Sequence, residues 1–444
     1  MKLVFILLPI VALASTAAHT IGASDPDIDE FGIEFGDIVI DADEKAKRAK
    51  ALMENEDAIR KHNDEFRHGK SGFYMKLNEL SDLPADEEEK QKFGLIHVEE
   101  PTDEYSRGAY PMHEDTYDRA SQTLLAELRQ NVQVPSSFFV SENHRTAVKN
   151  QAQCGSCAAF ATVAAVETCL LKNGANLQGL DLSEQSLLDC AYNPAKYANG
   201  CNGATISAYS IFLASNLNGK LPHETVDPYL NTNPRLQCPN KPSFNVGAKV
   251  TSKIVNHNCD ESTMEMLVVQ YGQVITSLFA GNSSEAAIRT SFSNYAGGIY
   301  DGCPASHSAR NNVNHAVTVV GFGEDNGQKY WLMRNSWGPH WGMQGYMKIK
   351  RGVNMCAIGR ECTVPICGSD SAPLSSLPPP PPASPTCDVS ARYVITGNYN
   401  WMFRNVTSQV RCTAGICQLR TGTMMGNSLC KQLCGSTTSE CFAA

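Results

Sequence analysis

The placement of the seventeen cysteines constrains the fold of this 444-residue chain more than any other feature of its sequence. No cysteine precedes Cys154, eleven lie between Cys154 and Cys367, and six lie between Cys387 and Cys441. This density indicates an oxidising compartment, in which disulfides form and persist. Because the total is odd, at least one thiol has no partner within the chain, and it is either a nucleophile or part of an intermolecular bond.

The N-terminus is consistent with such a compartment. Lys2 precedes an apolar run over residues 3–13, and small residues follow at 14–18, so residues 1–18 are predicted to be a secretory signal peptide. The run is too short to span a bilayer, and no other stretch is long enough, so no membrane span is expected. We expect the protein in the secretory pathway, in a lysosome or outside the cell, with Asn282 and Asn405 as candidate glycosylation sites.

Composition excludes several classes of protein. With 42% apolar and 19% charged residues, the chain can bury a sizeable core and is not wholly disordered. The net charge of −9 argues against a nucleic-acid partner. The acidic run at 86–89 is predicted to be a solvated face.

The chain divides by composition into five parts. A highly charged segment without cysteine follows the signal peptide, and the proline run at 378–382 is predicted to be part of a stiff linker. The density of cysteine after this linker is typical of a small module stapled by disulfides. The predicted boundaries are the signal peptide at 1–18, a propeptide at 19–133, a catalytic domain at 134–368, a Pro-rich linker at 369–386 and a cysteine-rich C-terminal module at 387–444.

Three elements of the central domain can be predicted from local pattern. Residues 157–174 are rich in alanine and end at Gly174, which predicts a helix. Residues 316–320 form a short apolar run before Gly321, which predicts a buried strand, and 329–334 predict its neighbour.

Cys154 and Cys157 lie three residues apart, and this spacing alone has several interpretations. The two cysteines could belong to structural disulfides, to a redox pair, or to half of a zinc site, or one could be a nucleophile. Cys157 would open the predicted helix, where the helix dipole and free N–H groups favour a thiolate. A thiolate is the reactive form of a cysteine nucleophile, which then needs a base and a group that orients the base.

Residues 148–157 resemble the nucleophile segment of papain-like cysteine proteases. Further blocks of that family are matched, in the family's order, at 182–190, 200–203, 314–323 and 330–342. The resemblance implies an α+β fold with two lobes, one mainly helical and one like a β-barrel, and a cleft between them. It also implies a cysteine endopeptidase that needs no cofactor and no metal, and that acts on protein and peptide substrates.

The resemblance assigns roles residue by residue. Cys157 would attack the scissile carbonyl as a thiolate paired with the His315 imidazolium, and Asn335 would orient His315. The Gln151 side chain and the Cys157 N–H would form the oxyanion hole, and Trp337 would shield the histidine–asparagine bond. The implied substrate-binding set is Gly203, Ala204, Ile206, Val313, Trp337 and Glu361. The implied disulfides are Cys154–Cys201, Cys190–Cys238 and Cys303–Cys356, which leave Cys157 as the spare thiol and Cys169, Cys259, Cys362 and Cys367 unassigned.

The chain departs from the family at several positions. Ala158 stands where the family has tryptophan, and Ala204 stands where it has a second glycine. A catalytically weak or silent peptide-binding member is therefore one alternative, and delivery of the C-terminal module to a surface is another. Glu361 is at the position that floors the pocket for the second substrate residue before the cut, and our hypothesis is that it admits Arg or Lys there. The alternative for Glu361 is a surface carboxylate.

The segment before the catalytic domain shows a second pattern. Six residues spaced four, four, three, four and four apart fall on one helix face; they are Glu44, Arg48, Leu52, Asn55, Ile59 and Asn63. This set resembles the ERFNIN pattern of cathepsin L-type propeptides, and Asn78, Leu80 and Asp82 resemble the block that follows it. The resemblance implies an inhibitory propeptide, and also cystatin-type inhibitors as partners. We expect self-processing near residues 130–136 at about pH 4–5, as carboxylates protonate and ion pairs weaken.

Overall fold

The computed structural model describes residues 42–96, 114–175, 179–193, 198–231, 238, 243, 245–256, 259–309, 313–371, 386–390, 407–413, 416–419 and 424–425. The predicted signal peptide, the proline run at 378–382 and the sequon at Asn405 lie outside these residues. Within the described ranges, no helix combines the length and the apolar character needed to cross a bilayer.

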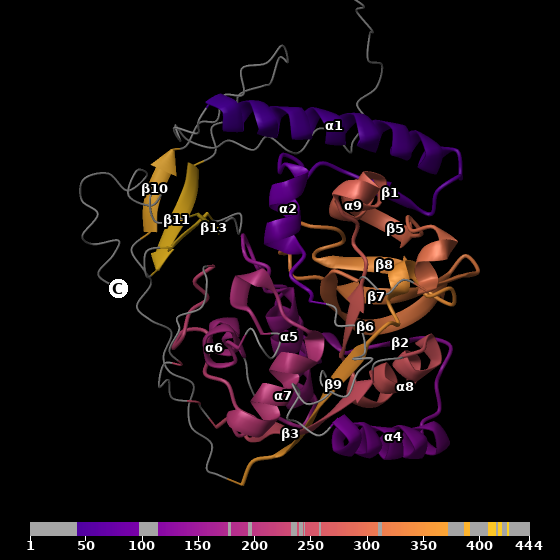
Figure 1. Cartoon of the computed structure of the whole chain (residues 1–444), viewed down its shortest axis with the longest axis vertical. Helices are drawn as coiled ribbons and strands as arrows, with labels where there is room; N and C mark the ends of the chain where they lie inside the picture. The colour runs from indigo at the N-terminus through magenta and orange to yellow at the C-terminus, as the bar shows by residue number, and fades with distance from the viewer. Residues whose placement is uncertain are drawn as a thin grey trace, which may run out of the picture. The chain divides into compact units, whose positions relative to one another are not determined.

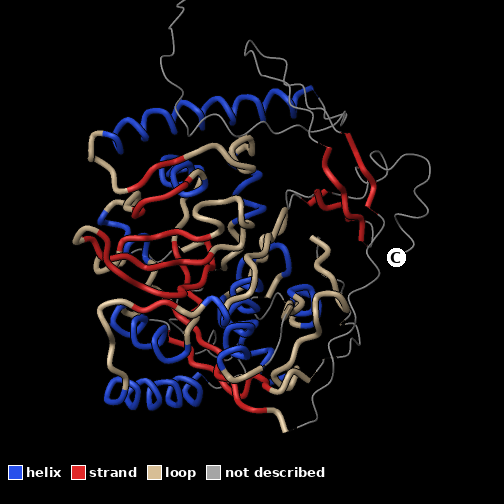
Figure 2. Tube along the Cα trace, turned by 180° about the vertical axis from the view of Figure 1, so that it is seen from behind, coloured by secondary structure: helices blue, strands red, loops and turns tan. Residues whose placement is uncertain are grey.

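A nine-stranded, largely antiparallel sheet runs through the described part of the chain (Figures 1 and 2). Its order is β1-β5-β8-β7-β6-β4-β9-β3, with β2 paired to β6 and with β5 and β8 parallel. The strands are β1 (Phe73–Met75), β2 (Phe138–Phe139), β3 (Ala248–Asn256), β4 (Val274–Leu278), β5 (Tyr295–Tyr300), β6 (His315–Asp325), β7 (Gln328–Arg334), β8 (Tyr346–Lys350) and β9 (Cys362–Ser369).

Strand β6 is the buried strand that the apolar run at 316–320 predicts. Its residues from His315 to Gly323 are all buried, because helices α5 and α8 both pack against this strand. The predicted neighbour at 329–334 is β7, which pairs antiparallel with β6.

Several of the helices begin or end at residues with recognisable capping chemistry. Helix α5 runs from Cys157 to Lys172, two residues short of Gly174, whose φ of 81° ends the helical path. Ser183 and Asp260 each accept a hydrogen bond from a first-turn N–H of the helix that follows. The α-helices after the first segment are α4 (Glu114–Asn131), α5 (Cys157–Lys172), α6 (Glu184–Cys190), α7 (Ile206–Asn216), α8 (Glu261–Tyr271) and α9 (Ala286–Ser293).

The short 3₁₀ helices lie in the connections between these elements. They are η1 (Glu142–His144), η3 (Gly200–Asn202), η4 (Ser283–Glu285), η5 (Ala305–Ala309) and η6 (Met355–Ala357).

Two buried clusters correspond to the two expected lobes. One joins α5, α6 and α7, and includes Phe160, Leu187 and Leu213. The other lies between the sheet, α8 and α9, and includes Phe292 and Trp331. The mixture of helix and antiparallel sheet agrees with the expected α+β class.

The first described segment consists of α1 (Ala42–Arg67), β1 and α2 (Ala85–Lys92), and it binds the rest of the chain along its length (Figure 1). On α1, Asn55 donates to the Ser81 carbonyl at 2.7 Å, and Asn63 exchanges two 2.8 Å bonds with the backbone of Met75. These two positions belong to the helix face that the spacing predicts. Strand β1 extends the sheet by pairing with β5.

The acidic run at 86–89 corrects the expectation of a solvated face. Asp86 is exposed, but Glu88 on the same helix is only 1% exposed. Its carboxylate is paired with Arg289 of α9 and accepts a hydrogen bond from the Ser293 hydroxyl. Glu88 is therefore a buried residue within a run of charges. Its partner Arg289 lies about two hundred residues away in sequence, so local pattern cannot predict the pair.

Five disulfides lie in the described residues, and Cys157 is the free cysteine there. Three are the pairs that the family resemblance implies, and two join cysteines that the sequence left unassigned. The pairs are Cys154–Cys201, Cys169–Cys367, Cys190–Cys238, Cys259–Cys362 and Cys303–Cys356.

Helix α4 packs on α8 and β3 (Figure 1). Leu125 and Leu128 of α4 are buried in the same cluster as the sheet core, and Arg129 donates to the Thr263 hydroxyl at 3.3 Å. Near the C-terminus, strands β10 (Thr386–Ser390), β11 (Thr407–Thr413), β12 (Ile416–Leu419) and β13 (Met424–Met425) form a separate antiparallel sheet.

Candidate active site

Cys157 is the first residue of α5, and its side chain is fully buried. Its sulfur accepts a 3.5 Å hydrogen bond from the backbone N–H of Ala316, at the start of β6. Because Cys154 is bonded to Cys201 and Cys157 is free, the two cysteines do not form the redox pair that their spacing allows. Cys157 is thus a thiol at a helix N-terminus, close to the strand that begins with His315.

His315 and Asn335 are brought together by the pairing of β6 with β7. The imidazole Nε2 lies 2.8 Å from the Asn335 Oδ1. Because an amide oxygen only accepts, Nε2 carries the hydrogen, and the neutral ring leaves Nδ1 as its basic atom. Nδ1 is buried, and the backbone of Lys92 lies near the ring.

Trp337 packs against the ring of His315. Its ring lies 4.9 Å from the imidazole, centroid to centroid, and is fully buried. An indole in this position keeps water from competing for the hydrogen bond, which strengthens the bond and fixes the ring orientation.

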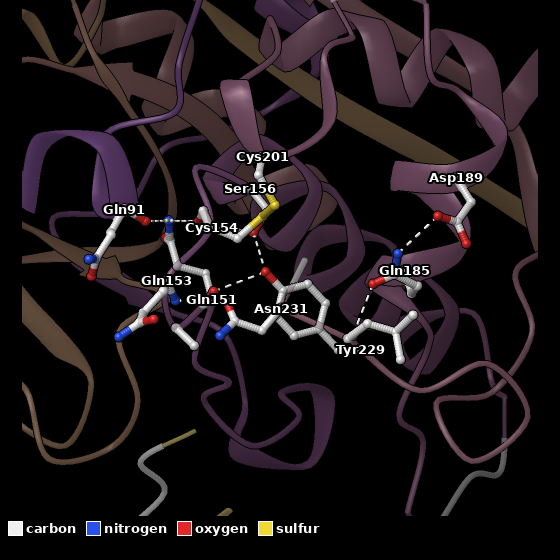
Figure 3. Close-up of a disulfide and its surroundings, with 12 residues drawn as sticks. Gln91, Gln151, Gln153, Cys154, Ser156, Gln185, Asp189, Cys201, Tyr229 and Asn231 are labelled. Carbon is white, nitrogen blue, oxygen red and sulfur yellow. Dashed lines mark hydrogen bonds between the residues drawn. A yellow bond between two sulfur atoms is a disulfide. The ribbon is translucent and has the colours of Figure 1, made fainter. Parts of the chain in front are cut away.

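Gln151 is held so that its amide nitrogen faces the nucleophile loop. Its backbone N–H donates to the Ser336 carbonyl at 2.8 Å, and its Oε1 accepts from the Ser336 hydroxyl at 2.7 Å. The Nε2 atom donates to the Cys154 carbonyl at 2.9 Å and to the Gln91 carbonyl at 3.2 Å (Figure 3), and it also donates to the Lys92 carbonyl at 3.3 Å. The last two acceptors belong to the segment that precedes the domain.

That segment runs directly over the site. Ala204 donates to the Gly94 carbonyl at 2.9 Å and accepts from Ile96 at 3.0 Å, while Leu95 donates to Asn314 at 3.1 Å. A Cβ on Gly94 would lie 1.7 Å from the Gly155 carbonyl oxygen, so only glycine fits at this crossing.

The neighbouring residue of the same segment contacts the imidazole. The Phe93 ring lies 5.9 Å from both the His315 and the Trp337 rings, centroid to centroid. The thiol and the imidazole are therefore covered together.

Burial under this segment changes the protonation of both groups. It raises the pKa of the Cys157 thiol to about 11, opposed by nearby backbone N–H groups, including that of Gly94. It lowers the pKa of His315 to about 4, opposed by the hydrogen bond to Asn335. In this covered state the pair is neutral, unlike the ion pair that the resemblance implies, because burial in a low dielectric disfavours both charged forms.

The expected pocket residues lie together in part. Ile206 and Val313 are buried in one cluster with Leu95 of the covering segment and with Ala204. Glu361 is 8% exposed rather than on the surface, and its carbonyl accepts from the Thr276 hydroxyl at 2.8 Å. The sequon residue Asn282 caps η4 by accepting from the Glu285 N–H at 2.9 Å.

Lys149 is a structural residue that sequence reasoning missed. Its ammonium lies 2.9 Å from Glu184, 3.2 Å from Glu167 and 2.7 Å from Asp181. These carboxylates come from different parts of the chain, so the cluster fastens the segment that leads to Gln151 onto the helical lobe. No local spacing predicts it.

Comparison with known proteins places these features in a wider group. The profile of the papain family cysteine protease matches residues 134–366. Human cathepsin L2 is 30% identical over 73% of this chain and 87% of its own length, and digestive cysteine proteinase 1 of Homarus americanus is 29% identical over 78% and 96%.

Solved structures give the same result and extend it to the covering segment. The digestive procathepsin L2 proteinase of Tenebrio molitor matches with a TM-score of 0.58 and 28% identity, over 74% of this chain and 95% of that one. The recombinant stem bromelain precursor matches with a TM-score of 0.55 and 26% identity, over 74% and 94%. Both are precursor forms.

Proposed function

The chain belongs to the papain family of cysteine proteases, and we propose that it is an endopeptidase whose catalytic residues are Cys157, His315, Asn335 and Gln151. One observation carries this assignment. The free thiol of the described residues lies at a helix start beside the strand that begins with His315, and the imidazole is already bonded to Asn335.

The mechanism follows from the positions of these groups. His315 Nδ1 takes the proton of Cys157, and the sulfur attacks the scissile carbonyl carbon. The oxyanion that forms is bound by the Gln151 Nε2 and the Cys157 N–H. The imidazolium then gives the proton to the departing amine, and water hydrolyses the acyl-enzyme by the same path in reverse.

Latency is the second part of the proposal. We assign residues 19–133 as an inhibitory propeptide, 134–368 as the catalytic domain, 369–386 as a linker and 387–444 as a separate module. The carbonyls of Gln91 and Lys92 occupy the Gln151 donor that a substrate oxyanion would need, and Gly94 covers Cys157. The precursor forms among the solved relatives support this arrangement.

Activation by acid, with the expected protonation of carboxylates, remains part of the proposal, and two buried groups affect it in opposite directions. Burial raises the pKa of Glu88, so acid protonates this carboxyl more readily when the propeptide is bound than when it is free. Glu88 therefore opposes release in acid. The lowered pKa of His315 acts in the other direction, because the uncovered imidazole takes up a proton more readily than the covered one.

Substrate selection is assigned to the residues around Leu95. Ala204 and Gly203 would pair with the substrate backbone, and Ile206, Val313 and Glu361 would line the pocket for the second residue before the cut. The buried position of Glu361 supports charge pairing with Arg or Lys there. Replacing Glu361 by Gln should reduce kcat/KM for an Arg-containing peptide relative to its Leu counterpart, and an unchanged ratio would exclude the role.

Location and partners complete the proposal. A signal peptide at 1–18, disulfides and glycosylation at Asn282 and Asn405 are consistent with a secreted or lysosomal enzyme, and cystatin-type proteins are candidate inhibitors. The departures at Ala158 and Ala204 favour, as the second candidate, a family member that binds peptides with little or no turnover.

One assay separates the two functions. Wild type, Cys157→Ala and Asn335→Ala are treated at about pH 4.5 with a reductant, and hydrolysis of a peptide library is measured. We expect no turnover for Cys157→Ala and a reduced kcat for Asn335→Ala. Equal turnover by wild type and Cys157→Ala would exclude the catalytic role, and binding without turnover by both would establish the second candidate.

A further inference from the structure

Gln151 and Cys157 must keep a fixed spacing if their N–H groups are to bind one oxyanion. They lie six residues apart in a connection without regular secondary structure, apart from the turn at 152–154. The side-chain oxygen of Gln151 is fixed by Ser336, and the disulfide of Cys154 fixes the middle of the loop. A further contact joins the two ends of this loop.

The hydroxyl of Tyr229 lies between residue 151 and residue 156 (Figure 3). It donates to the Gln151 carbonyl at 2.9 Å and lies 2.7 Å from the Ser156 hydroxyl. A phenol has one hydrogen, so the serine is the donor in the second bond, and its hydrogen is shared with the Cys154 carbonyl at 3.3 Å. One buried oxygen therefore joins the residue that supplies the first oxyanion donor to the residue that precedes the second.

Tyr229 is itself held rigidly. Its ring packs edge-to-face on Phe160 of α5 at 4.9 Å, and its backbone N–H donates to Glu224 at 2.7 Å. The backbone N–H of the next residue, Leu230, donates to the Gln185 side chain at 3.0 Å. The tyrosine is 8% exposed, so its hydroxyl is a fixed point rather than a surface group.

The Ser156 hydroxyl contacts Tyr229 in place of the usual helix-capping bond. It occupies the N-cap position of α5, where a serine hydroxyl normally accepts a hydrogen bond from a first-turn N–H. Here its side chain makes no cap bond, because the hydroxyl is turned to Tyr229. The Ala159 N–H of the first turn donates instead to the Ser156 carbonyl at 2.9 Å, and the Cys157 N–H lies beside its own sulfur.

We propose that Tyr229 is a positioning residue of the catalytic site, which sets the spacing between the two oxyanion donors through Gln151 and Ser156. This inference rests on the proposed function. It predicts a specific kinetic pattern, because the hydroxyl affects the developing oxyanion and leaves the thiol and the pocket residues unchanged.

The test compares Tyr229→Phe with Tyr295→Phe in the activated enzyme. Tyr295 is a matched control: its buried hydroxyl also makes two bonds, to Gly298 at 2.7 Å and from Lys348 at 3.1 Å, and neither involves the nucleophile loop. Complete loss of one oxyanion donor costs about 10²–10³ in kcat, so loss of its positioning should lower kcat by roughly 10-fold. We expect KM to change little in Tyr229→Phe, and kcat to be unchanged in Tyr295→Phe.

Two probes separate positioning from a general loss of structure. A peptide aldehyde adds to Cys157 by forming a carbon–sulfur bond, and its oxygen becomes the oxyanion, so its affinity should fall by the same factor as kcat/KM. Iodoacetamide alkylates the sulfur with loss of iodide and forms no oxyanion, so its rate should be unchanged. Equal effects of Tyr229→Phe on both probes, or no difference from Tyr295→Phe, would overturn the proposal.

If Tyr229→Phe does not fold, Ser156→Ala tests the positioning role instead. It removes one of the two bonds, so we expect the same pattern with a smaller fall in kcat, and an unchanged kcat would reject the role. Wild-type enzyme is assayed first beside Cys157→Ala. If wild type has no Cys157-dependent hydrolysis, the proposed function fails; if it is active and the tyrosine variant equals it, only this inference fails.

Discussion

The binding of the propeptide should weaken in acid because of His315. The imidazole has a pKa of about 4 when it is covered, against an ordinary value of 6.5. Because the imidazole has the lower pKa in the bound state, protonation favours the free state. The propeptide therefore binds most tightly above the free pKa of the imidazole, and its binding weakens as the pH falls from about 6.5 towards 4. The groups that affect the pKa of the ring are the Asn335 side chain and both the backbone and the charge of Lys92.

The size of the effect follows from these two values. Between pH 7 and pH 5 the binding constant of the propeptide should fall by about 20-fold, or ~2 kcal/mol, and by pH 4 the total loss should reach ~100-fold. Lys92 does not change the pH dependence of propeptide binding in this range. Its pKa is lowered to about 8, so below that value it is protonated in both the bound and the free state. Glu88 has the opposite effect on the pH dependence of propeptide binding, because its pKa is raised in the bound state.

The assay uses the full-length Cys157→Ala zymogen, which cannot process itself. Hydrogen exchange of the Leu95 and Ile96 amides, which donate across the cleft to Asn314 and Ala204, reports propeptide opening after correction for intrinsic exchange. The control carries His315→Gln in addition, and both proteins keep Glu88, so their difference isolates the imidazole. The reasoning is refuted if the two proteins lose protection equally between pH 7 and pH 4.

The remaining predictions concern buried charge. Arg289→Ala leaves Glu88 buried without the cation it pairs with, which costs about 3–5 kcal/mol, so this zymogen should activate at pH 7. The control Arg60→Ala, in an ion pair where Arg60 is 74% exposed, should stay latent. Equal latency of the two variants would contradict the role of the Glu88–Arg289 pair. Lys149→Met leaves Glu167 and Glu184 without their shared cation and should lower the free energy of unfolding by ~3–5 kcal/mol in urea. The exposed Lys50→Met should leave the urea midpoint unchanged, and a similar midpoint in Lys149→Met would refute the role of that cluster.

Local sequence pattern predicted the parts of the site that depend on local chemistry. Alanine content and Gly174 predicted α5, and the apolar run after His315 predicted β6. Each prediction holds because helix and strand formation depend on neighbouring residues. The resemblance to a family implied which cysteine would be free.

The contacts that local pattern could not predict are long-range. Tyr229 meets Gln151 across 78 residues, and Glu88 meets Arg289 across 201. Their partners are chosen by the fold as a whole, so neither residue has a distinctive sequence neighbourhood. The charge of Glu88 even pointed to the wrong environment, because acidic runs are usually solvated.

The pairing of β1 with β5 gives maturation a further effect. While Phe73–Met75 are in place, the backbone of β5 has a neighbour on each side, β1 and β8. When Phe73–Met75 leave, β5 becomes an edge strand with unpaired backbone N–H and C=O groups. Tyr300 also loses its contact with the ring of Phe73. In the proposed mature enzyme, loss of this segment would uncover Cys157 and would also leave an exposed sheet edge that can pair with another strand.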